Sequence, residues 1–278
     1  MKRKIFYIVR YSVLQHSKAW NIAKENDFNT YKEILFSNSR LHSKYELFKA
    51  FTIQSLQKQE KADVEYETEV IVLTSDELPQ LHLSKLMMLK DEIPLTILEI
   101  GATESMFSAL SNYIARSFSS EADNFLYATV RIDDDDMLSK NYESRLLSYI
   151  TPENKDYIVS FPIGIESYVV IPEEGSPKLE YSIEIDFPKI ALGLAHIGFY
   201  NATHKRVETK KAHVYLTGAH TTVDERFTLI YDMTPRAYIR IAYDEQDTQA
   251  RGIKKRLSKS KLIDSQELLN EFPSTANF

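Results

Sequence analysis

Short apolar runs alternate with segments of helical periodicity along the first half of the chain. Four runs rich in β-branched and aromatic residues have the pattern of strands buried on both faces: residues 5–9, 69–74, 94–100 and 125–132. Between them, three segments place apolar side chains at three- and four-residue spacings, which predicts amphipathic helices: residues 39–57, 78–89 and 104–118. The predicted order of elements is therefore βαβαβαβ.

The second half of the chain is less regular. Residues 157–162 predict one further strand. Two apolar segments, 167–171 and 179–185, flank the turn-rich run 172–177, and this arrangement indicates a hairpin. Because strands separated by helices imply a mainly parallel sheet with right-handed crossovers, we predict an α/β fold of the Rossmann-like type, flanked by helices.

Parallel sheets bind ligands beyond the carboxyl ends of their strands, so candidate sites should follow the predicted strands. Four segments do so: residues 10–12, 74–77, 101–104 and 133–136. Within the first two, Arg10, Ser12 and Asp76 are the candidate ligand-binding side chains.

Composition narrows the possible functions. A net charge of -6 argues against a general nucleic-acid binder, because such proteins neutralise phosphates with a basic face. The sequence has no cysteine, which excludes disulfides, thiolate nucleophiles and cysteine-ligated zinc, so a metal must use oxygen or imidazole ligands. No run approaches the roughly 20 apolar residues of a membrane-spanning helix. We therefore expect a cytoplasmic protein, at most peripheral at the inner face of the membrane.

Four consecutive aspartates close the strand predicted at residues 125–132. Their mutual repulsion is costly in a partly buried site unless a cation is bound, and carboxylates suit Mg²⁺ or Mn²⁺, which keep positions open for diphosphate oxygens. In an extended chain, Asp133 and Asp135 would face one side and Asp134 and Asp136 the other. The alternative interpretation is a solvated acidic turn, or acidic residues before a helix that begins near Ser139.

Several segments of the sequence resemble a bacterial rhamnosyltransferase family with a GT-A-like fold. The acidic signature and its strand, T-V-R-I-D-D-D-D-M-L at residues 129–138, carry most of the resemblance. Further similar residues are Arg10, Tyr11 and Ser12 after the first strand, and Arg40, Leu41, Leu47, Phe48, Ser55, Leu56 and Gln59 in the first helix. The sequence departs from the family pattern at Tyr243, where a histidine is expected.

The resemblance implies roles for the residues of the acidic run. Asp133, Asp135 and Asp136 would bind Mn²⁺ or Mg²⁺, with Asp133 and Asp134 also contacting the nucleotide-sugar donor. Arg10 would contact phosphate or base, and Arg131 would support the carboxylates. For both arginines the alternative is a structural salt bridge.

Other candidates lie in the second half. His220 could complete the metal site, although a lone histidine is more often a structural hydrogen-bonding group. An inverting transfer, which the resemblance implies, needs a general base for the acceptor hydroxyl, and the candidates are Asp186, which we favour, Glu184 and Asp224. Near the carboxyl terminus, a basic segment predicted to be helical could contact anionic lipid headgroups or could be a solvated helix; its basic residues are Arg251, Lys254, Lys255, Arg256, Lys259 and Lys261.

The sequence therefore predicts a metal-dependent glycosyltransferase that moves a sugar such as rhamnose to a saccharide or lipid-linked saccharide acceptor, in surface polysaccharide or lipopolysaccharide synthesis. Residues 1–250 would form one GT-A-like domain, with a donor-binding half, 1–138, and an acceptor-side half, 139–250, followed by the tail 251–278. Two alternatives remain open: a metal-dependent nucleotidyl or phosphoryl transferase that uses the same carboxylates, and a non-catalytic binding protein stabilised by metal.

Overall fold

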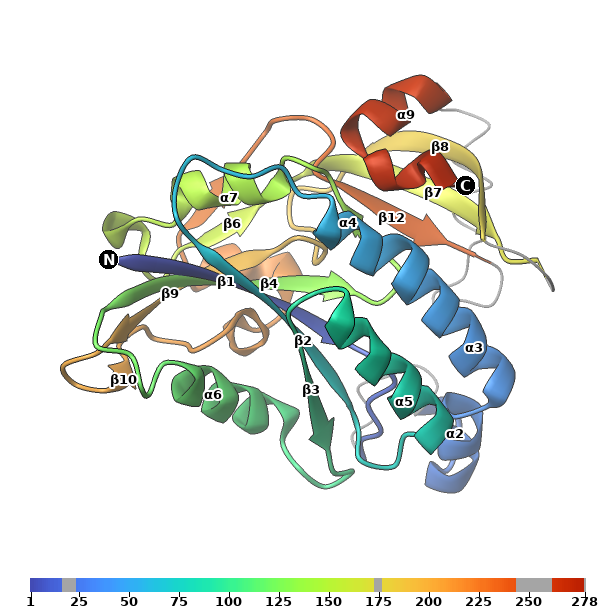
Figure 1. Cartoon of the computed structure of the whole chain (residues 1–278), viewed down its shortest axis with the longest axis horizontal. Helices are drawn as coiled ribbons and strands as arrows, with labels where there is room; N and C mark the ends of the chain where they lie inside the picture. The colour runs from blue at the N-terminus through green and yellow to red at the C-terminus, as the bar shows by residue number, and fades with distance from the viewer. Residues whose placement is uncertain (17–23, 173–176, 244–261, 278) are drawn as a thin grey trace.

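The computed structural model describes residues 1–16, 24–172, 177–243 and 262–277, which form two β-sheets with helices packed around them (Figure 1). Within these residues the larger sheet has eight strands in the order β11-β6-β9-β4-β1-β2-β3, with β10 paired to β9. Its strands are β1 (Lys2–Arg10), β2 (Glu67–Ser75), β3 (Leu95–Ile100), β4 (Phe125–Asp133), β6 (Ile158–Ser160), β9 (Ala195–Asn201), β10 (Arg206–Val207) and β11 (Leu229–Tyr231).

The centre of this sheet is parallel, as the alternation of apolar runs and helices predicts. Strand β1 pairs in parallel with both β2 and β4, and β2 pairs in parallel with β3. Strand β9 then runs antiparallel between β4 and β6. The predicted βαβαβαβ order and the α/β class are confirmed.

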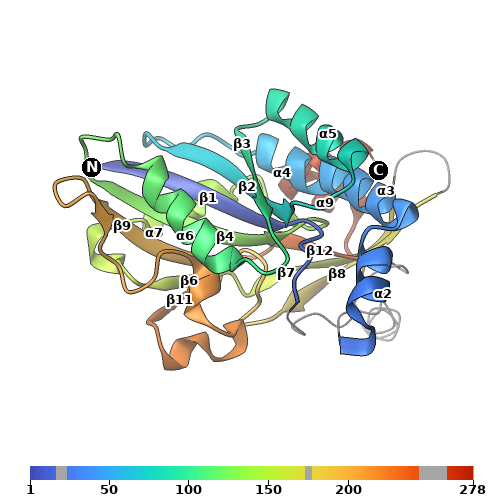
Figure 2. The ribbon, with the colours of Figure 1, turned by 90° about the horizontal axis from the view of Figure 1, so that it is seen from below.

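Helices cover both faces of the larger sheet (Figure 2). Along β1, Ile5, Tyr7 and Val9 point to one hydrophobic cluster, whereas Phe6 and Ile8 point to the other. The first cluster packs against helices α3 (Asn38–Leu47), α4 (Gln54–Gln57), α5 (Gln80–Met88) and α7 (Tyr142–Tyr149), and the second packs against α6 (Met106–Ser117). Because residues 5–9 of β1 are buried on both faces of the sheet, this part of the strand is continuously apolar and does not alternate with polar residues.

A smaller sheet follows in the second half, in the order β5-β12-β7-β8. Its strands are β5 (Met137–Leu138), β7 (Ile163–Val170), β8 (Lys178–Asp186) and β12 (Tyr238–Ala242), and the C-terminal helix α9 (Ser265–Glu271) covers it (Figure 1). The β7–β8 pair is antiparallel, which confirms the predicted hairpin. Parallel pairing in this sheet joins only β12 and β7 among the described strands, so the mainly parallel prediction holds for the larger sheet alone.

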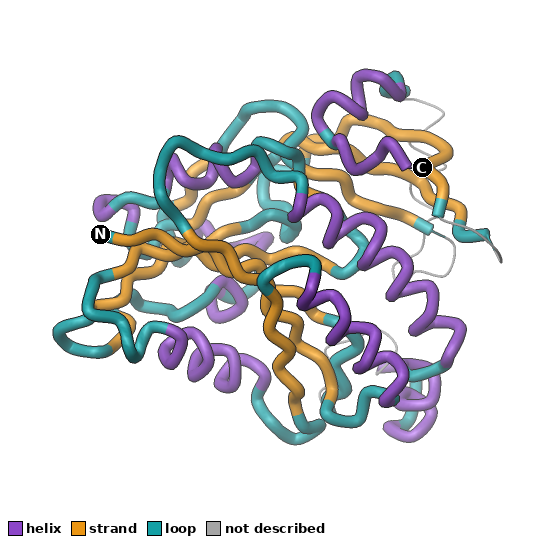
Figure 3. Tube along the Cα trace, in the orientation of Figure 1, coloured by secondary structure: helices purple, strands orange, loops and turns teal. Residues whose placement is uncertain are grey.

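The predicted helix at residues 39–57 is formed in three parts. Helix α3 continues without a break into a π-helix, η1 (Phe48–Ile53), and then into α4, and Figure 3 shows them as one helical tube. Leu47 and Phe51 pack in the core of the smaller sheet, whereas Phe48 and Ile53 pack in the core of the larger one. This helix therefore lies between the two sheets.

Some predictions of local structure differ from what is observed. The strand predicted at 157–162 is β6 (Ile158–Ser160) only, since Pro162 cannot donate a ladder hydrogen bond. Helix α2 (Phe28–Leu35), capped by Asp27, was not predicted. The basic segment 251–261 lies outside the described residues. In the part of the chain that the structure describes, no helix has the length and apolarity needed to cross a membrane.

Candidate functional site

The carboxyl ends of β1, β2 and β4 meet at one edge of the larger sheet. Arg10, the last residue of β1, lies opposite Asp133 on one side and Leu73 on the other. The parallel register therefore brings the end of the first strand to the beginning of the acidic run. This is the edge at which open α/β sheets bind their ligands.

The acidic run is the turn through which the chain leaves one sheet and enters the other. Asp133 is the last residue of β4, and Met137 is the first residue of β5 in the smaller sheet. The N–H of Asp136 donates to the carbonyl of Asp133 at 3.4 Å and closes a turn, which we call the acidic turn (residues 133–136). Because the chain turns here, the alternation of sides expected for an extended run does not hold beyond Asp133.

Asp133 faces two arginines. Its carboxylate lies 3.3 Å from Arg10 Nη2 and 3.9 Å from Arg131 Nη2, and its side chain keeps 40% exposure. Desolvation raises the pKa of Asp133, but the positive charges of Arg131 and Arg10 outweigh it, and the net pKa is below the ordinary value. Asp133 is therefore a carboxylate that remains ionised, with two cations beside it.

The ring of Tyr215 holds both arginines in place. The guanidinium carbons of Arg10 and Arg131 lie 5.2 Å and 5.4 Å from its centroid, within the range of cation–π contacts. Tyr215 belongs to the short helix η4 (Val214–Thr217), and its hydroxyl reaches the carbonyl of Ile8 at 3.5 Å. Two guanidinium groups therefore face the single carboxylate of Asp133.

Asp134 has a different environment. Its carboxylate forms an ion pair with Lys44 of α3, and the two side chains are only 6% and 13% exposed. Lysine is usually a surface residue, but Lys44 is largely shielded from solvent against the acidic turn. The pair links the turn to α3, so the predicted donor contact of Asp134 is occupied by a structural partner.

Asp135 and Asp136 are both buried. Asp136 Oδ1 accepts the N–H of Ile241 on β12 at 2.9 Å, which ties the turn to the smaller sheet. Burial raises the pKa of Asp136 well above its ordinary value, and the charges of Asp135 and Asp133 raise it further. The turn thus concentrates negative charge that its own neighbours do not fully neutralise.

The predicted metal ligands do not form a ready-made cage. Among the described residues, no group of three or more histidine, aspartate or glutamate side chains is arranged to hold a metal ion. His220 lies at the start of the short helix η5 (His220–Glu225), where its Nδ1 contacts the carbonyl oxygen of Lys189. This contact is the structural hydrogen bond that the alternative interpretation of His220 describes.

The candidate bases Asp224 and Asp186 lie in different places. Asp224 Oδ1 pairs with Lys189 Nζ at 2.7 Å on the surface, and this hydrogen bond lowers its pKa, which weakens it as a base. Asp186 is exposed at the end of the outer strand β8. The hydrogen-bonded row from Asp186 through Ile163 and Ala237 to Ser139 spans three strand spacings, roughly 14 Å, so Asp186 is not adjacent to the acidic turn.

Ser12 and Asp76 both follow strands at the same edge. Ser12 adopts a left-handed backbone conformation with φ of 51°, is buried, and accepts a hydrogen bond from Arg40 Nη1 at 3.3 Å. Asp76 is exposed, and its N–H donates to the carbonyl of Ile100 at 3.2 Å. Asp76 is accessible to a ligand, whereas the hydroxyl of Ser12 is engaged in shaping the loop after β1.

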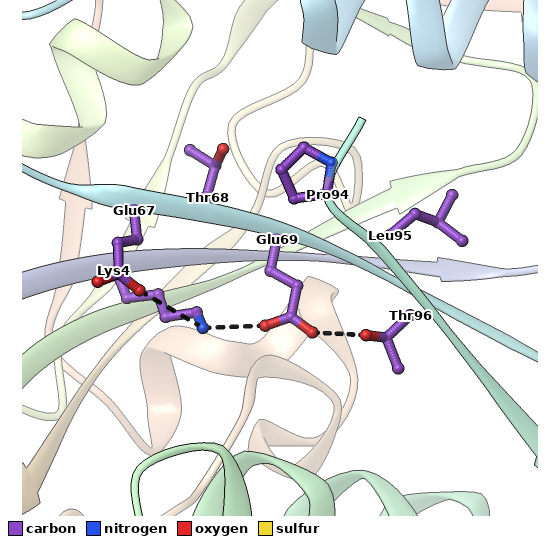
Figure 4. A pocket seen from close by; sticks show the side chains of 7 residues that line it. All are labelled: Lys4, Glu67, Thr68, Glu69, Pro94, Leu95 and Thr96. Carbon is purple, nitrogen blue, oxygen red and sulfur yellow. Dashed lines mark hydrogen bonds and ion pairs between the residues drawn. The ribbon is translucent and has the colours of Figure 1, made fainter. Parts of the chain in front are cut away.

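A pocket of about 460 Å³ lies at the opposite end of the strands (Figure 4). There Glu69 Oε2 pairs with Lys4 Nζ at 2.9 Å and Glu69 Oε1 accepts from the hydroxyl of Thr96 at 2.8 Å. The pocket is lined by Lys4, Glu67, Thr68, Glu69, Pro94, Leu95 and Thr96. Because the pocket lies at the amino ends of β1, β2 and β3, it is separate from the acidic turn.

Several residues around the acidic turn were not predicted from the sequence. Lys44 pairs with Asp134, the Thr52 hydroxyl donates to the carbonyl of Asp136, and Tyr215 lies against Arg10 and Arg131. Lys44 and Thr52 lie in the helix whose residues carry part of the family resemblance, and that resemblance was the available signal. Tyr215 lies more than 80 residues after Arg131 in a segment without strong periodicity. No local pattern distinguishes it from the other 16 tyrosines of the 17 in the chain.

Fold and site together define an α/β protein of the Rossmann-like type, with an acidic turn and paired arginines at the ligand edge of its sheet. The family model described as putative rhamnosyl transferase matches residues 4–255. The chain belongs to this family. The match includes the acidic turn and each of its partners named above, whereas α9 lies beyond it.

Similar solved structures include a putative glucose-1-phosphate thymidylyltransferase from Bacillus anthracis in complex with a sucrose, at 11% identity and a TM-score of 0.39. The alignment covers 95% of this chain and 99% of that one. An inositol-1-phosphate CTP transferase from T. maritima is 13% identical, with a TM-score of 0.32 and coverage of 93% and 96%. No curated protein matches the chain. Scores this low carry no argument about activity.

Proposed function

We propose that the protein is a metal-dependent glycosyltransferase of the GT-A type, which transfers a sugar from a nucleotide-sugar donor to a saccharide acceptor. One observation carries the proposal: in a member of a rhamnosyl transferase family, four aspartates and two arginines meet at the carboxyl edge of a parallel sheet. Such an edge offers both signs of charge, which a metal–diphosphate group requires.

The carboxylates fit a small divalent cation. Mg²⁺ commonly uses one or two protein carboxylates and completes its shell with water and substrate phosphates, so a cage of three ligands is not needed. Asp134 is paired with Lys44 and Asp136 is bonded to β12, whereas Asp133 is partly exposed beside Asp135. We assign the cation to Asp133, the aspartate of the turn that is not buried, together with its near neighbour Asp135; these two would hold Mn²⁺ or Mg²⁺. When bound, the cation supplies Lewis-acid stabilisation of the leaving diphosphate.

Arg10 and Arg131 would bind the diphosphate oxygens. Guanidinium groups donate paired hydrogen bonds to phosphate. Because the Tyr215 ring already holds the guanidinium groups of Arg10 and Arg131, these side chains would lose less entropy when the diphosphate binds. Asp76, exposed at the same edge, is available to hydrogen-bond another part of the nucleotide.

Deprotonation of the acceptor hydroxyl completes the proposed inverting reaction. We assign the base to Asp186 before Asp224, because Lys189 occupies the Asp224 carboxylate and lowers its pKa. Asp186 lies three strand spacings from Ser139, so this assignment requires the acceptor hydroxyl to bind on the Asp186 side of the acidic turn. The family description suggests rhamnose as the transferred sugar. An acceptor in surface polysaccharide synthesis is a further part of our proposal.

Thermal stabilisation by a panel of nucleoside diphosphate sugars, rhamnose donors included, tests the proposal with and without Mn²⁺. A donor that binds only the native state raises the melting temperature, and we expect this rise to require metal. Turnover should then release a nucleoside diphosphate. Release of pyrophosphate would instead support a nucleotidyl transferase, and stabilisation by Mn²⁺ without any response to nucleotides would support a metal-stabilised binding protein.

A further inference from the structure

One helix contacts the acidic turn and the strand that follows it at successive positions. From α3, Lys44 pairs with Asp134. Further along the helix, the Thr52 hydroxyl reaches the carbonyls of the turn, and Ser55 Oγ accepts the N–H of Leu138 at 3.2 Å. Just beyond the end of α4, Gln59 Nε2 donates to the carbonyl of Ser139 at 2.8 Å. Side chains of this helix, and of Gln59 just after it, thus contact the chain from residue 133 to residue 139.

Thr52 is the member of this series that contacts the backbone of the turn itself. Its Oγ1 lies 2.9 Å from the carbonyl oxygen of Asp136 and 3.4 Å from that of Asp133, and the residue is fully buried. A hydroxyl carries one proton, so the shorter contact to Asp136 is the hydrogen bond. The same side chain therefore touches both ends of the turn.

The π-helical geometry explains how Thr52 reaches this position. Phe51, Thr52 and Ile53 are consecutive and all fully buried, although a regular surface helix buries only one stripe. Phe51 packs in the core of the smaller sheet and Ile53 in that of the larger one. Thr52 lies between them, where the acidic turn crosses from sheet to sheet. Single π-turns within α-helices frequently mark functional sites.

We infer that Thr52 is a positioning residue for the proposed reaction, with no contact of its own to substrate. Its hydroxyl fixes the backbone of the acidic turn so that Asp133 and Asp135 are presented together to the cation and the diphosphate. This inference rests on the proposed function, because the effect that we expect from the Thr52 hydrogen bond is on metal binding at the acidic turn. The side chains that hold ligand orientation commonly contribute 10- to 100-fold to metal affinity.

Three variants separate positioning from general stability. Thr52→Val keeps the shape of the side chain but removes the hydroxyl, Thr52→Ser restores the hydroxyl, and Thr96→Val removes a threonine hydrogen bond at the opposite end of the strands. The first measurement is amide hydrogen exchange of the peptide that covers residues 133–138. The second is titration of the full chain with Mn²⁺, alone and with inorganic pyrophosphate.

We expect Thr52→Val to exchange about tenfold faster at the acidic turn and to bind Mn²⁺ about 10- to 100-fold more weakly, with Thr52→Ser and Thr96→Val near wild type. Wild-type exchange and affinity in Thr52→Val would overturn the inference. Equal changes in Thr52→Val and Thr96→Val would also overturn it, because they would reflect general loosening. If the wild-type protein bound no Mn²⁺, the proposed function would fail, while the exchange data would still decide the role of Thr52.

Discussion

Arg10 and Asp133 end two neighbouring parallel strands in register, and the Arg10 guanidinium lies 3.3 Å from the Asp133 carboxylate. The pairing of β1 with β4 thereby holds a cation and an anion next to each other at the carboxyl edge of the sheet. In the proposed function the cation would bind a diphosphate and the anion a metal ion. Both proposed halves of donor binding therefore depend on the register of β1 and β4.

Replacement of Arg10 by methionine should weaken donor binding by about 10- to 100-fold, since a desolvated charge-assisted hydrogen bond contributes roughly 1.5–3 kcal/mol. Arg10→Lys should recover only part of this loss, because an ammonium cannot form the paired hydrogen bonds. Calorimetric titration with the donor identified in the thermal screen provides the measurement. Arg145→Met is the matched control, because Arg145 is also ion-paired, to Asp232, and also lies over an aromatic ring. Equal losses in both variants would remove Arg10 from the site.

Asp135→Ala should abolish donor turnover while the fold remains intact. The loss of a metal ligand should reduce turnover by at least about 100-fold, the upper end of the effect of residues that only support ligands. Turnover at saturating Mn²⁺ and circular dichroism of the variant are the measurements. Asp91→Ala, which removes an exposed aspartate of the 3-10 helix η2 (Leu89–Asp91), controls for the change in net charge. Unchanged turnover in Asp135→Ala would reject the proposed metal site.

Lys44 and Asp134 should contribute to stability as a pair. Removal of either charge leaves the other buried without its partner, at a cost of about 3–5 kcal/mol, whereas their joint replacement should cost much less. Urea unfolding of Lys44→Met, Asp134→Asn and the double variant gives the coupling energy directly. Additive losses would show that the two side chains act independently, and Asp134 would then be available for the donor contact that the sequence suggests.

The sequence was sufficient to predict β1 to β4 and the helices that alternate with them, because these strands are apolar and the helices have clear apolar stripes. It did not predict β9, β10 and β11 of the same sheet. It also indicated where Arg10 and Asp133 would lie, since residues that follow parallel strands meet at one edge. The partners of the turn were harder to predict. Lys44 has the polarity of a surface residue, and only the packing of α3 between two sheets shows that it is largely shielded from solvent.

The second half shows a further limit of sequence patterns. Strand β5 has only two residues, and its partner β12 follows about 100 residues later, so nothing local predicts that the acidic turn joins two sheets. The bond from the Ile241 N–H to Asp136 and the contact of Tyr215 with both arginines depend on that long-range closure. Such contacts arise from the tertiary fold and leave no periodic signal in the chain.

His213 should make the protein less stable in mild acid. The residue is fully buried, its Nε2 lies 3.0 Å from the carbonyl oxygen of Phe107, and its Nδ1 is buried without a hydrogen-bond partner in the described structure. Burial lowers its pKa from 6.5 to about 4. Between these two values the unfolded chain binds a proton that the folded chain does not, so stability falls as the pH falls from 6.5 to 4.

The shift in the pKa of His213 corresponds to a decrease in the free energy of unfolding, relative to pH 7, of about 2 kcal/mol at pH 5 and about 3 kcal/mol below pH 4. His213→Gln retains a side-chain N–H for the Phe107 carbonyl but has no group that titrates in this range. The carboxyl groups of the two proteins are the same, so they contribute equally to acid sensitivity and cancel in the comparison. Urea unfolding gives the difference in unfolding free energy between wild type and variant at each pH. We expect this difference to change by about 2 kcal/mol between pH 7 and pH 5. Parallel losses in both proteins would mean that His213 is protonated without cost in the folded state, and that its burial does not disfavour the charge.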